Sequence, residues 1–340
     1  MDDIVSAGSE NYRVFTFSWE LIDICQYNCS YCSAMHFNIS MFKEHPEWRD
    51  AWRHVLKMLS LKTIKSPFAI EILGGEPTLH PDIHDIVKGA CAIENNRRVE
   101  LVTNFAKSLS FFEEFDIKEN KKLSIEISYH PEYCTDKWIQ KIIDFSVCKH
   151  LNISPNINLP DEKKWWPQTK ELLDTLKDNN INIGLNFLQE VPSGPQGSWK
   201  PEYTDEFWKY FHDYFALDET AVTDTDKFQH IDNASEKNIK SDPGVADGSM
   251  MKEVEYKTRD GETHLLSEVE INRYDLRQFK GWKCTPLMYI INMAGTVSNH
   301  CTGEELPVYK VNERNLTACR ECPLDRCNCD TKFLYAKERV

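Results

Sequence analysis

Three cysteines stand within eight residues near the N-terminus, in the stretch CQYNCSYC. Cys25, Cys29 and Cys32 are spaced C-x3-C-x2-C, and the aromatic Tyr31 directly precedes the last of them. Thiolates are the usual ligands of iron–sulfur clusters. Three of them can hold three irons of a cubane and leave the fourth iron open to a small chelating molecule. A closed zinc site would have four ligands, so the set favours a cluster, with zinc or chance spacing as alternatives.

A second stretch, EILGGEPTLHP, carries conformationally special and charged residues directly after an apolar run. Gly74 and Gly75 let the backbone approach a ligand closely and expose amide N–H groups. The carboxylate of Glu76 could receive an ammonium group, and Pro77 stiffens the turn. Taken alone, GGEP is equally compatible with an ordinary turn between a strand and a helix.

Both stretches follow segments that are predicted to be strands. Apolar runs and helix-length amphipathic stretches alternate about six times up to Leu188. This alternation predicts an α/β fold with parallel strands, either a partial (β/α)6 TIM-like barrel or an open doubly wound sheet. In both architectures chemistry gathers at the carboxyl ends of the strands. The expected strands are 13–24, 68–73, 99–104, 122–129, 151–157 and 181–188, and the expected helices are 46–61, 80–93, 108–115, 136–148 and 168–179.

The alternation of expected strands and helices ends after the barrel, and the sequence predicts three parts along the chain. Residues 13–195 form the barrel, 196–252 a helical and acidic insertion, and 253–340 a hairpin followed by a small cysteine-rich α+β module. The hairpin is expected to turn at Asp260-Gly261, and a second hairpin at Ala294-Gly295. The last 60 residues hold six of the twelve cysteines.

Charge and cysteine content narrow the classes of function. Forty Lys+Arg against 54 Asp+Glu give a formal net charge of −14, which disfavours nucleic acid and anionic membranes as partners. The N-terminus lacks the basic and apolar pattern of a signal peptide, and no run of ~18 apolar residues suits a membrane span. These features predict a cytoplasmic protein, in which thiols stay reduced and serve as metal or cluster ligands.

Taken together, CQYNCSYC after the first strand and GGEP after the second resemble the radical S-adenosylmethionine (SAM) superfamily. The resemblance covers about Arg13 to Leu188. It implies that Cys25, Cys29 and Cys32 hold a 4Fe–4S cluster whose open iron binds the amino and carboxylate groups of SAM. It also implies that one electron cleaves the sulfonium C–S bond, and that the resulting 5′-deoxyadenosyl radical abstracts hydrogen from an unactivated C–H bond.

The resemblance also implies roles for residues at the ends of the expected strands. Those expected at the SAM site are Tyr31, Gly74, Gly75, Glu76, Pro77, Thr103, Asn104 and Ser128. His130 is a candidate acid or base, with a purely structural histidine as the alternative. Cys134 is a candidate for returning a hydrogen atom to the substrate radical. Residues expected to line the substrate pocket are Asn156, Asn158, Asn186 and Gln189.

The C-terminal cysteines resemble the auxiliary-cluster modules of the superfamily, called SPASM when long and twitch when short. The candidate ligands are Cys284, Cys301, Cys319, Cys322, Cys327 and Cys329. No cysteine follows Cys329, so the seventh ligand of the longer module is missing. One layout places a single auxiliary 4Fe–4S cluster on the first four cysteines. The other divides all six between two clusters, and a zinc knuckle on the last four is a further alternative.

The resemblance leaves the substrate open between a peptide and a small molecule. Our first expectation is oxidative modification of a peptide, by crosslinking or dehydrogenation, with flavodoxin or ferredoxin as electron donor. The cluster motif begins at residue 25, so we expect no N-terminal peptide-recognition domain of the kind that many peptide-modifying relatives carry, which weakens this expectation. A separate partner could still deliver the peptide. The alternatives are a dehydrogenase or epimerase of a small polar metabolite, such as an amino sugar or nucleotide, and a non-catalytic zinc or cluster protein that binds a partner.

Overall fold

The computed structural model divides the chain into two compact units. The large unit comprises Val14–Pro201 and Pro286–Ala318, and the small unit comprises Met1–Arg13, Glu202–Thr285 and Cys319–Val340. The described residues are 4–7, 15–32, 46–61, 63–115, 122–146, 153–159, 165–179, 181, 184–187, 191–194, 197–199, 204–214, 254–266, 271, 276–286, 288–299, 301, 304–306, 311–316, 318–325, 327 and 337–339.

The large unit is built on a nine-stranded sheet in the order β15-β14-β13-β2-β3-β4-β5-β6-β7. Its six consecutive strands β2 to β7 all pair in parallel, which confirms the predicted parallel α/β architecture. The bounds are β2 (Phe15–Ile22), β3 (Phe68–Gly74), β4 (Asn96–Thr103), β5 (Leu123–Tyr129), β6 (Ile153–Leu159) and β7 (Gly184–Phe187).

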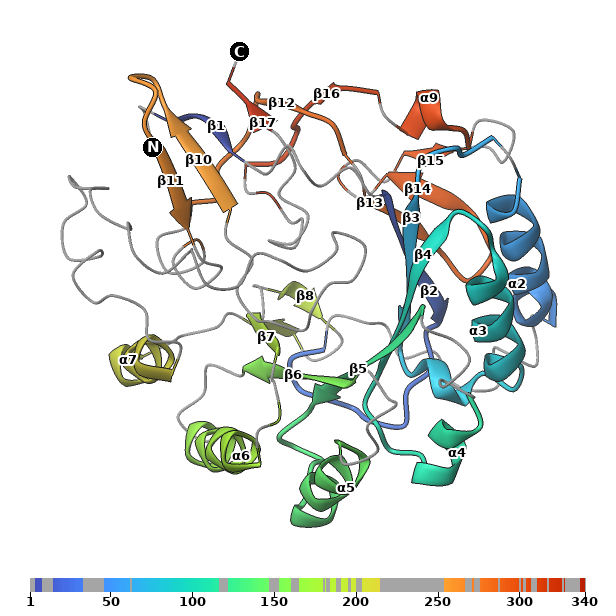
Figure 1. Cartoon of the computed structure of the whole chain (residues 1–340), viewed down its shortest axis with the longest axis vertical. Helices are drawn as coiled ribbons and strands as arrows, with labels where there is room; N and C mark the ends of the chain where they lie inside the picture. Colours follow the sequence, from blue (N-terminus) through green and yellow to red (C-terminus); the bar gives the residue numbers. More distant parts are fainter. Residues whose placement is uncertain are drawn as a thin grey trace. The chain divides into compact units, whose positions relative to one another are not determined.

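Helices connect these strands and cover one side of the curved sheet (Figure 1). A doubly wound sheet would carry helices on both faces, so the arrangement agrees with a partial barrel. The connecting elements are α2 (Pro46–Leu59), the 3-10 turn η1 (Pro77–Leu79), α3 (Ile83–Ala92), α4 (Leu109–Glu113), α5 (Asp136–Ser146) and α6 (Trp166–Asp178).

Successive strand residues alternate between an apolar and a polar face. Phe68, Ile70 and Ile72 of β3 are all fully buried and form the apolar face. The alternate position Glu71 pairs in register with Ser18 of β2 and Glu100 of β4. Because the apolar row must face the helices, this polar row lies on the opposite, inner face of the sheet.

The hairpin around Gly295 extends this sheet, although the sequence assigned it to the C-terminal module. It consists of β13 (Met288–Ile291) and β14 (Val297–Asn299), followed by β15 (Glu305–Leu306). β13 pairs in parallel with β2 and so covers a strand edge that would otherwise be open. The predicted turn is present, with Gly295 at a φ of +77°.

The small unit contains a second sheet, in the order β11-β10-β1-β17-β12-β16. The expected hairpin turns at Asp260-Gly261, and the expected helix in the insertion is α7 (Asp205–Tyr214). The N-terminal strand of this sheet was not predicted. The strands are β1 (Ile4–Ala7), β10 (Val254–Thr258), β11 (Thr263–Leu266), β12 (Lys283–Cys284), β16 (Arg320–Glu321) and β17 (Lys337–Glu338).

Three short elements complete the description: β8 (Val191–Gly194), β9 (Gly197–Trp199) and α9 (Glu313–Leu316). The acidic stretch 218–248 lies outside the described residues. None of the described helices has the length and apolar character that crossing a membrane requires.

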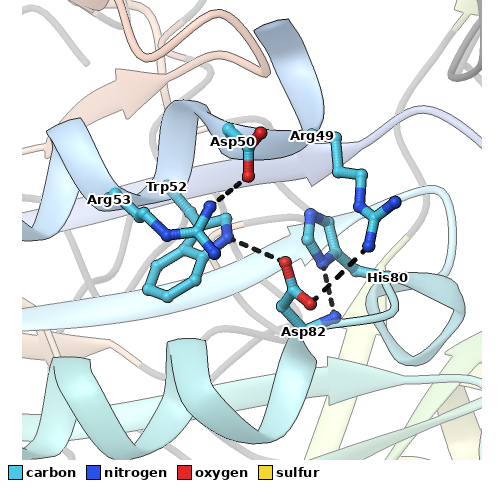
Figure 2. A network of polar contacts seen from close by, with 6 residues as sticks. All are labelled: Arg49, Asp50, Trp52, Arg53, His80 and Asp82. Atoms are coloured by element: carbon cyan, nitrogen blue, oxygen red, sulfur yellow. Dashed lines mark hydrogen bonds and ion pairs between the residues drawn. The ribbon is translucent and has the colours of Figure 1, made fainter. Parts of the chain in front are cut away.

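A polar network holds the start of α3 against α2 (Figure 2). The Trp52 Nε1–H donates to the Asp82 carboxylate at 3.2 Å, and the Arg49 guanidinium lies 4.0 Å from the same group. The Asp82 amide N–H donates to His80 Nδ1 at 3.1 Å. Since Nδ1 accepts this bond and His80 is only 2% exposed, the imidazole is held in its neutral form.

We therefore expect His80 to make folding sensitive to mild acid. Burial lowers the pKa of His80 below its ordinary value. Between pH ~6.5 and that lower pKa, the unfolded chain binds a proton that the folded chain does not, so the free energy of unfolding falls as pH decreases. His80→Gln should give a shallower fall between about pH 7.5 and 5.5 in urea unfolding. Equal slopes for the variant and the wild type would contradict this assignment.

Candidate active site

Four loops that follow neighbouring strands meet at the carboxyl ends of β2, β3, β4 and β5. Cys25 comes three residues after β2, and Glu76 two residues after β3. Asn104 directly follows β4, and His130 directly follows β5. We call residues 25–32 the cysteine loop and residues 130–134 the β5 loop. The predicted clustering of these motifs at one edge of the sheet is confirmed by the contacts below.

The two glycines of GGEP lie directly against the chain that leads into the cysteine loop. The Gly75 N–H donates to Ile22 O at 2.5 Å and the Glu76 N–H donates to Ile24 O at 2.7 Å. A Cβ atom on Gly74 would lie 2.2 Å from Ile22 O, and one on Gly75 would lie 2.4 Å from Ile24 O. The glycines are therefore required by contact between two backbone segments. The Gly75 N–H, expected to be exposed to a ligand, donates to Ile22 O instead, while the expected contact of the two glycines with SAM stays a prediction.

Glu76 is fully buried and joins the β3 loop to the end of β4. Its Oε1 accepts from the Thr78 N–H at 3.1 Å, the Thr78 hydroxyl at 2.5 Å and the Thr103 hydroxyl at 2.7 Å. Its Oε2 accepts from the Asn104 N–H at 2.7 Å. Burial raises the pKa of Glu76, and these hydrogen bonds oppose that rise. The carboxylate is thus surrounded by donors of the protein itself, and its expected contact with an ammonium group stays a prediction.

Asn104 connects the end of β4 to the cysteine loop. Its Nδ2 lies 3.7 Å from Cys25 Sγ, and its Oδ1 accepts from the exposed Gln26 Nε2 at 3.0 Å. Its carbonyl accepts from the buried Trp138 Nε1 at 3.1 Å. The next residue, Phe105, is fully buried with a φ of +57°. The sequence singled out Asn104 but gave no signal for Gln26, an unspecified position between Cys25 and Cys29, or for Trp138, which lies outside the motifs.

The three thiols of the cysteine loop influence one another electrostatically. Cys29 is 5% exposed, while Cys25 and Cys32 are half-buried. The pKa of Cys29 is raised to about 12, first by burial and then by the charge of Cys32. Burial also raises the pKa of Cys25, and Glu76 and Cys32 add to the rise. Three thiolates at this site therefore need a positively charged group between them.

These features fit an iron–sulfur cluster. The Tyr27 N–H donates to Cys25 Sγ at 3.3 Å, and N–H donors to the sulfurs are a normal part of cluster environments. Within the part of the chain that the structure describes, no three His, Cys, Asp or Glu side chains converge as ligands of a single metal ion would. Each thiolate of a cubane binds a different iron, so the ligands of a cluster need not converge on one point.

His130 contacts two residues of the cysteine loop. Its Nδ1 lies 3.1 Å from the Tyr31 hydroxyl and 3.5 Å from Cys29 Sγ. Burial lowers the pKa of His130 to about 4, so the ring is neutral near pH 7. The His130 N–H donates to Cys134 Sγ at 3.3 Å. Cys134 is 5% exposed, and burial raises the pKa of its thiol to about 12, so Cys134 stays protonated.

Apart from Gln189, the remaining residues predicted for this site lie on η1, β5, β6 and β7. Pro77 is buried at the start of η1, and Ser128 is half-buried one residue before the end of β5. Asn156, Asn158 and Asn186 lie on β6 and β7, and Asn158 pairs in register with Asn186. Gln189 lies outside the described residues. Their predicted roles stay predictions.

Of the five candidate C-terminal cysteines that the structure describes, four lie in the small unit. Cys284 is on β12, which pairs with β16, and Cys322 directly follows β16. Cys284, Cys322 and Cys327 are buried, whereas Cys319 is exposed. The fully buried Lys337 donates from Nζ to Cys284 Sγ at 3.1 Å.

Neither auxiliary-cluster layout is tested by this arrangement. Cys301 belongs to the large unit, and Cys329 lies outside the described residues. Every layout that the sequence suggests contains one of these two cysteines. One cluster, two clusters and a zinc knuckle therefore all stay predictions.

Comparison with known proteins shows to which family the chain belongs. The family model of the radical SAM superfamily matches residues 19–189, half of the chain, and spans every loop of the site. This chain belongs to the radical SAM superfamily. Membership implies a 4Fe–4S cluster and S-adenosylmethionine as cofactors, and Cys25, Cys29 and Cys32 are the residues that would hold this cluster.

Individual relatives are similar over only part of their length. A GTP 3′,8-cyclase from Synechococcus elongatus is 30% identical over 101 residues, which is 30% of each chain. SuiB from Streptococcus suis bound to S-adenosylmethionine has a TM-score of 0.45 and 17% identity, covering 61% of this chain and 48% of that one. HemN from Escherichia coli, a coproporphyrinogen III oxidase, has a TM-score of 0.42 and 11% identity, covering 61% and 54%. The chain thus spans about half or less of these relatives.

Because the Ile22 carbonyl lies so close to Gly74, we expect even a methyl side chain at this position to destabilise the fold severely. Gly74→Ala should lower the free energy of unfolding by at least about 4 kcal/mol, because its Cβ meets a backbone carbonyl that cannot move aside and its φ is +138°. Gly89→Ala is the control, since there the new Cβ meets only the flexible end of Leu56. It should change stability by less than ~1 kcal/mol in the same urea unfolding measurement. Similar losses in the two variants would contradict the backbone contact.

The hydrogen bond from Thr103 to the buried Glu76 carboxylate predicts a second effect on the free energy of unfolding. Thr103→Val keeps the side-chain shape but removes one donor to Glu76 and the acceptor of the Phe105 N–H, and should lower the free energy of unfolding by about 1–3 kcal/mol. Thr175→Val is the control, because that hydroxyl donates only to Glu171 O of its own helix. The control substitution should lower the free energy of unfolding by less than ~1 kcal/mol. Chemical denaturation of both variants measures the difference, and a Thr103→Val loss no larger than the control would argue against this role.

Proposed function

We propose that this protein cleaves S-adenosylmethionine reductively and uses the resulting 5′-deoxyadenosyl radical to remove a hydrogen atom from a substrate. The observation that carries the proposal is the meeting of the cysteine loop with the GGEP loop and the end of β4. Glu76 and Asn104 join the three segments through hydrogen bonds to each other and to Gln26 and Cys25. A zinc site or a chance cysteine cluster would not require the loops after three adjacent strands to interlock.

The residues around the cysteine loop would bind and shield the reacting groups. The cluster, when bound, supplies the electron that breaks the sulfonium bond of SAM. Cys25, Cys29 and Cys32 would hold it, and Asn104 and the Tyr27 N–H would donate to the Cys25 sulfur. The neutral His130 and the buried Tyr31 would keep water away from the Cys29 side. Exclusion of water matters because a primary carbon radical reacts with almost any nearby C–H bond.

The substrate that we favour is a peptide, modified by crosslinking or dehydrogenation. Net oxidation requires an electron acceptor, which an auxiliary cluster on the C-terminal cysteines would provide. Cys284, Cys322 and Cys327 are each buried in the small unit and are among the candidates for its ligands. Flavodoxin or ferredoxin would deliver the electron that starts the reaction.

A small polar metabolite is the second candidate, and the inner face of the sheet favours it. Ser18, Glu71 and Glu100 form one register row on that face, and each is less than 10% exposed. Arg98 pairs with Glu100 and is held charged there, since the neighbouring carboxylates raise its pKa despite burial. Such a row offers hydrogen-bond partners to the hydroxyl and amino groups of a sugar or nucleotide.

The first test is anaerobic cleavage of SAM. With reconstituted iron and sulfide and a strong reductant, we expect the wild type to form 5′-deoxyadenosine. Cys25→Ala, Cys29→Ala and Cys32→Ala should each abolish it, because an open-iron cluster needs all three thiolates. Cys91→Ala is the matched control, since Cys91 lies on α3 away from the cysteine loop and should leave the product unchanged.

The outcome separates the candidate functions. Iron binding without deoxyadenosine in the wild type would overturn the proposed reaction and favour a protein that binds a partner through its metal. Stoichiometric zinc in a colourless protein would do the same. If deoxyadenosine forms, candidate peptides and polar metabolites are compared by how strongly each accelerates it.

A further inference from the structure

The β5 loop contacts every position of the cysteine loop from Tyr27 to Tyr31. The Asn28 N–H donates to the Tyr133 hydroxyl at 2.8 Å. The Ser30 N–H donates to both carboxylate oxygens of Glu132, at 3.2 Å each, and the Ser30 hydroxyl donates to the same carboxylate. Two successive side chains of the β5 loop, Glu132 and Tyr133, thus accept from the backbone N–H groups on either side of Cys29.

Aromatic rings add to these hydrogen bonds. Tyr27 stacks on Tyr133 with ring centroids 4.3 Å apart and an angle of 5° between the planes. On the inner side, Tyr31 lies parallel to His130 at 6.2 Å and shares a hydrogen bond with it. Stacked pairs of this kind stabilise beyond the area that they bury. The cysteine loop is therefore held on both its exposed and its buried side.

The sheet order shows how far the cysteine loop reaches. β3 and β4 lie between β2 and β5, so a loop that leaves β2 and contacts the β5 loop crosses the ends of both intervening strands. Asn104 at the end of β4 holds its first part through Gln26 and Cys25. Glu132 and Tyr133 hold its second part, which carries Cys29 and Cys32.

We propose that the β5 loop is the template that holds the cysteine loop in its ligating shape, with Glu132 and Tyr133 as positioning residues. This inference rests on the proposed function, because it concerns the cluster that the cysteines would hold. A loop of eight residues without such contacts would sample many shapes, and each ligand would have to be ordered when the cluster binds. The contacts order the loop beforehand, so they should slow the loss of the cluster.

Three variants separate the contacts. Tyr133→Phe removes the acceptor for the Asn28 N–H but keeps the stacked ring. Glu132→Ala removes both bonds to Ser30, whereas Glu132→Gln keeps an acceptor of the same shape and should largely restore the wild-type behaviour. Glu113→Ala, a carboxylate removed from α4, is the matched control.

The first measurement is made on the apo-protein and depends neither on a bound cluster nor on enzymatic activity. Hydrogen exchange of the apo-protein, resolved to the peptide covering residues 25–32, should show slow exchange in the wild type and in Glu113→Ala. Glu132→Ala and Tyr133→Phe should each exchange at least about 10-fold faster there, while the peptides of β3 and β4 stay unchanged. Unchanged protection of residues 25–32 in both variants would overturn the proposal, and an unchanged sheet shows that the variants still fold.

The second readout is retention of the cluster under an iron chelator, followed by visible absorbance and EPR. Outer contacts of metal ligands typically change affinity 10–100-fold. We expect loss about 10–100-fold faster in Glu132→Ala and in the Glu132→Ala/Tyr133→Phe double variant, with Glu132→Gln and Glu113→Ala close to the wild type. Loss at the wild-type rate in the double variant would refute the template while leaving the proposed function intact. A wild type that takes up no iron would instead overturn the proposed function itself.

Discussion

The buried carboxylate of Glu76 is the interaction on which the geometry of the site depends. A fully buried charge is costly unless donors surround it, and here the donors come from two different strand ends, Thr78 after β3 and Thr103 and Asn104 at the end of β4. Satisfying this one group therefore fixes the distance between the two loops. Asn104, held in this way by its own N–H, presents its side chain to Gln26 and Cys25, so the position of the first thiol follows from the same carboxylate.

Backbone contact supplies the second constraint. Two carbonyls at the end of β2 accept the N–H groups of Gly75 and Glu76, at a separation that excludes any side chain on Gly74 or Gly75. The chain entering the cysteine loop is thus fastened to the loop after β3. From there it crosses β4 and ends against the β5 loop. The cysteines lie on a segment held at both ends, with chemistry placed where four parallel strands end.

The three thiols of the cysteine loop lie where their ionised forms are disfavoured unless a cluster binds them. Burial and mutual charge raise the pKa of Cys25 and Cys29, so the protein has gathered three groups that repel one another when ionised. A cluster would provide the positive charge that offsets this repulsion, and membership of the radical SAM superfamily implies one. Binding of the cluster would then add stability to a loop that the protein's own contacts already order.

The sequence by itself determined the parallel α/β architecture, the cysteine triad and which motif follows which strand. These depend on local patterns: the alternation of apolar runs, the spacing of Cys25 to Cys32 and the paired glycines. Only the tertiary structure decided that Glu76 faces the protein interior, and that the hairpin at Gly295 extends the barrel sheet beside β2. It alone brought Glu132 and Tyr133 to the cysteine loop, because contacts between residues about 100 positions apart leave no local pattern in the chain.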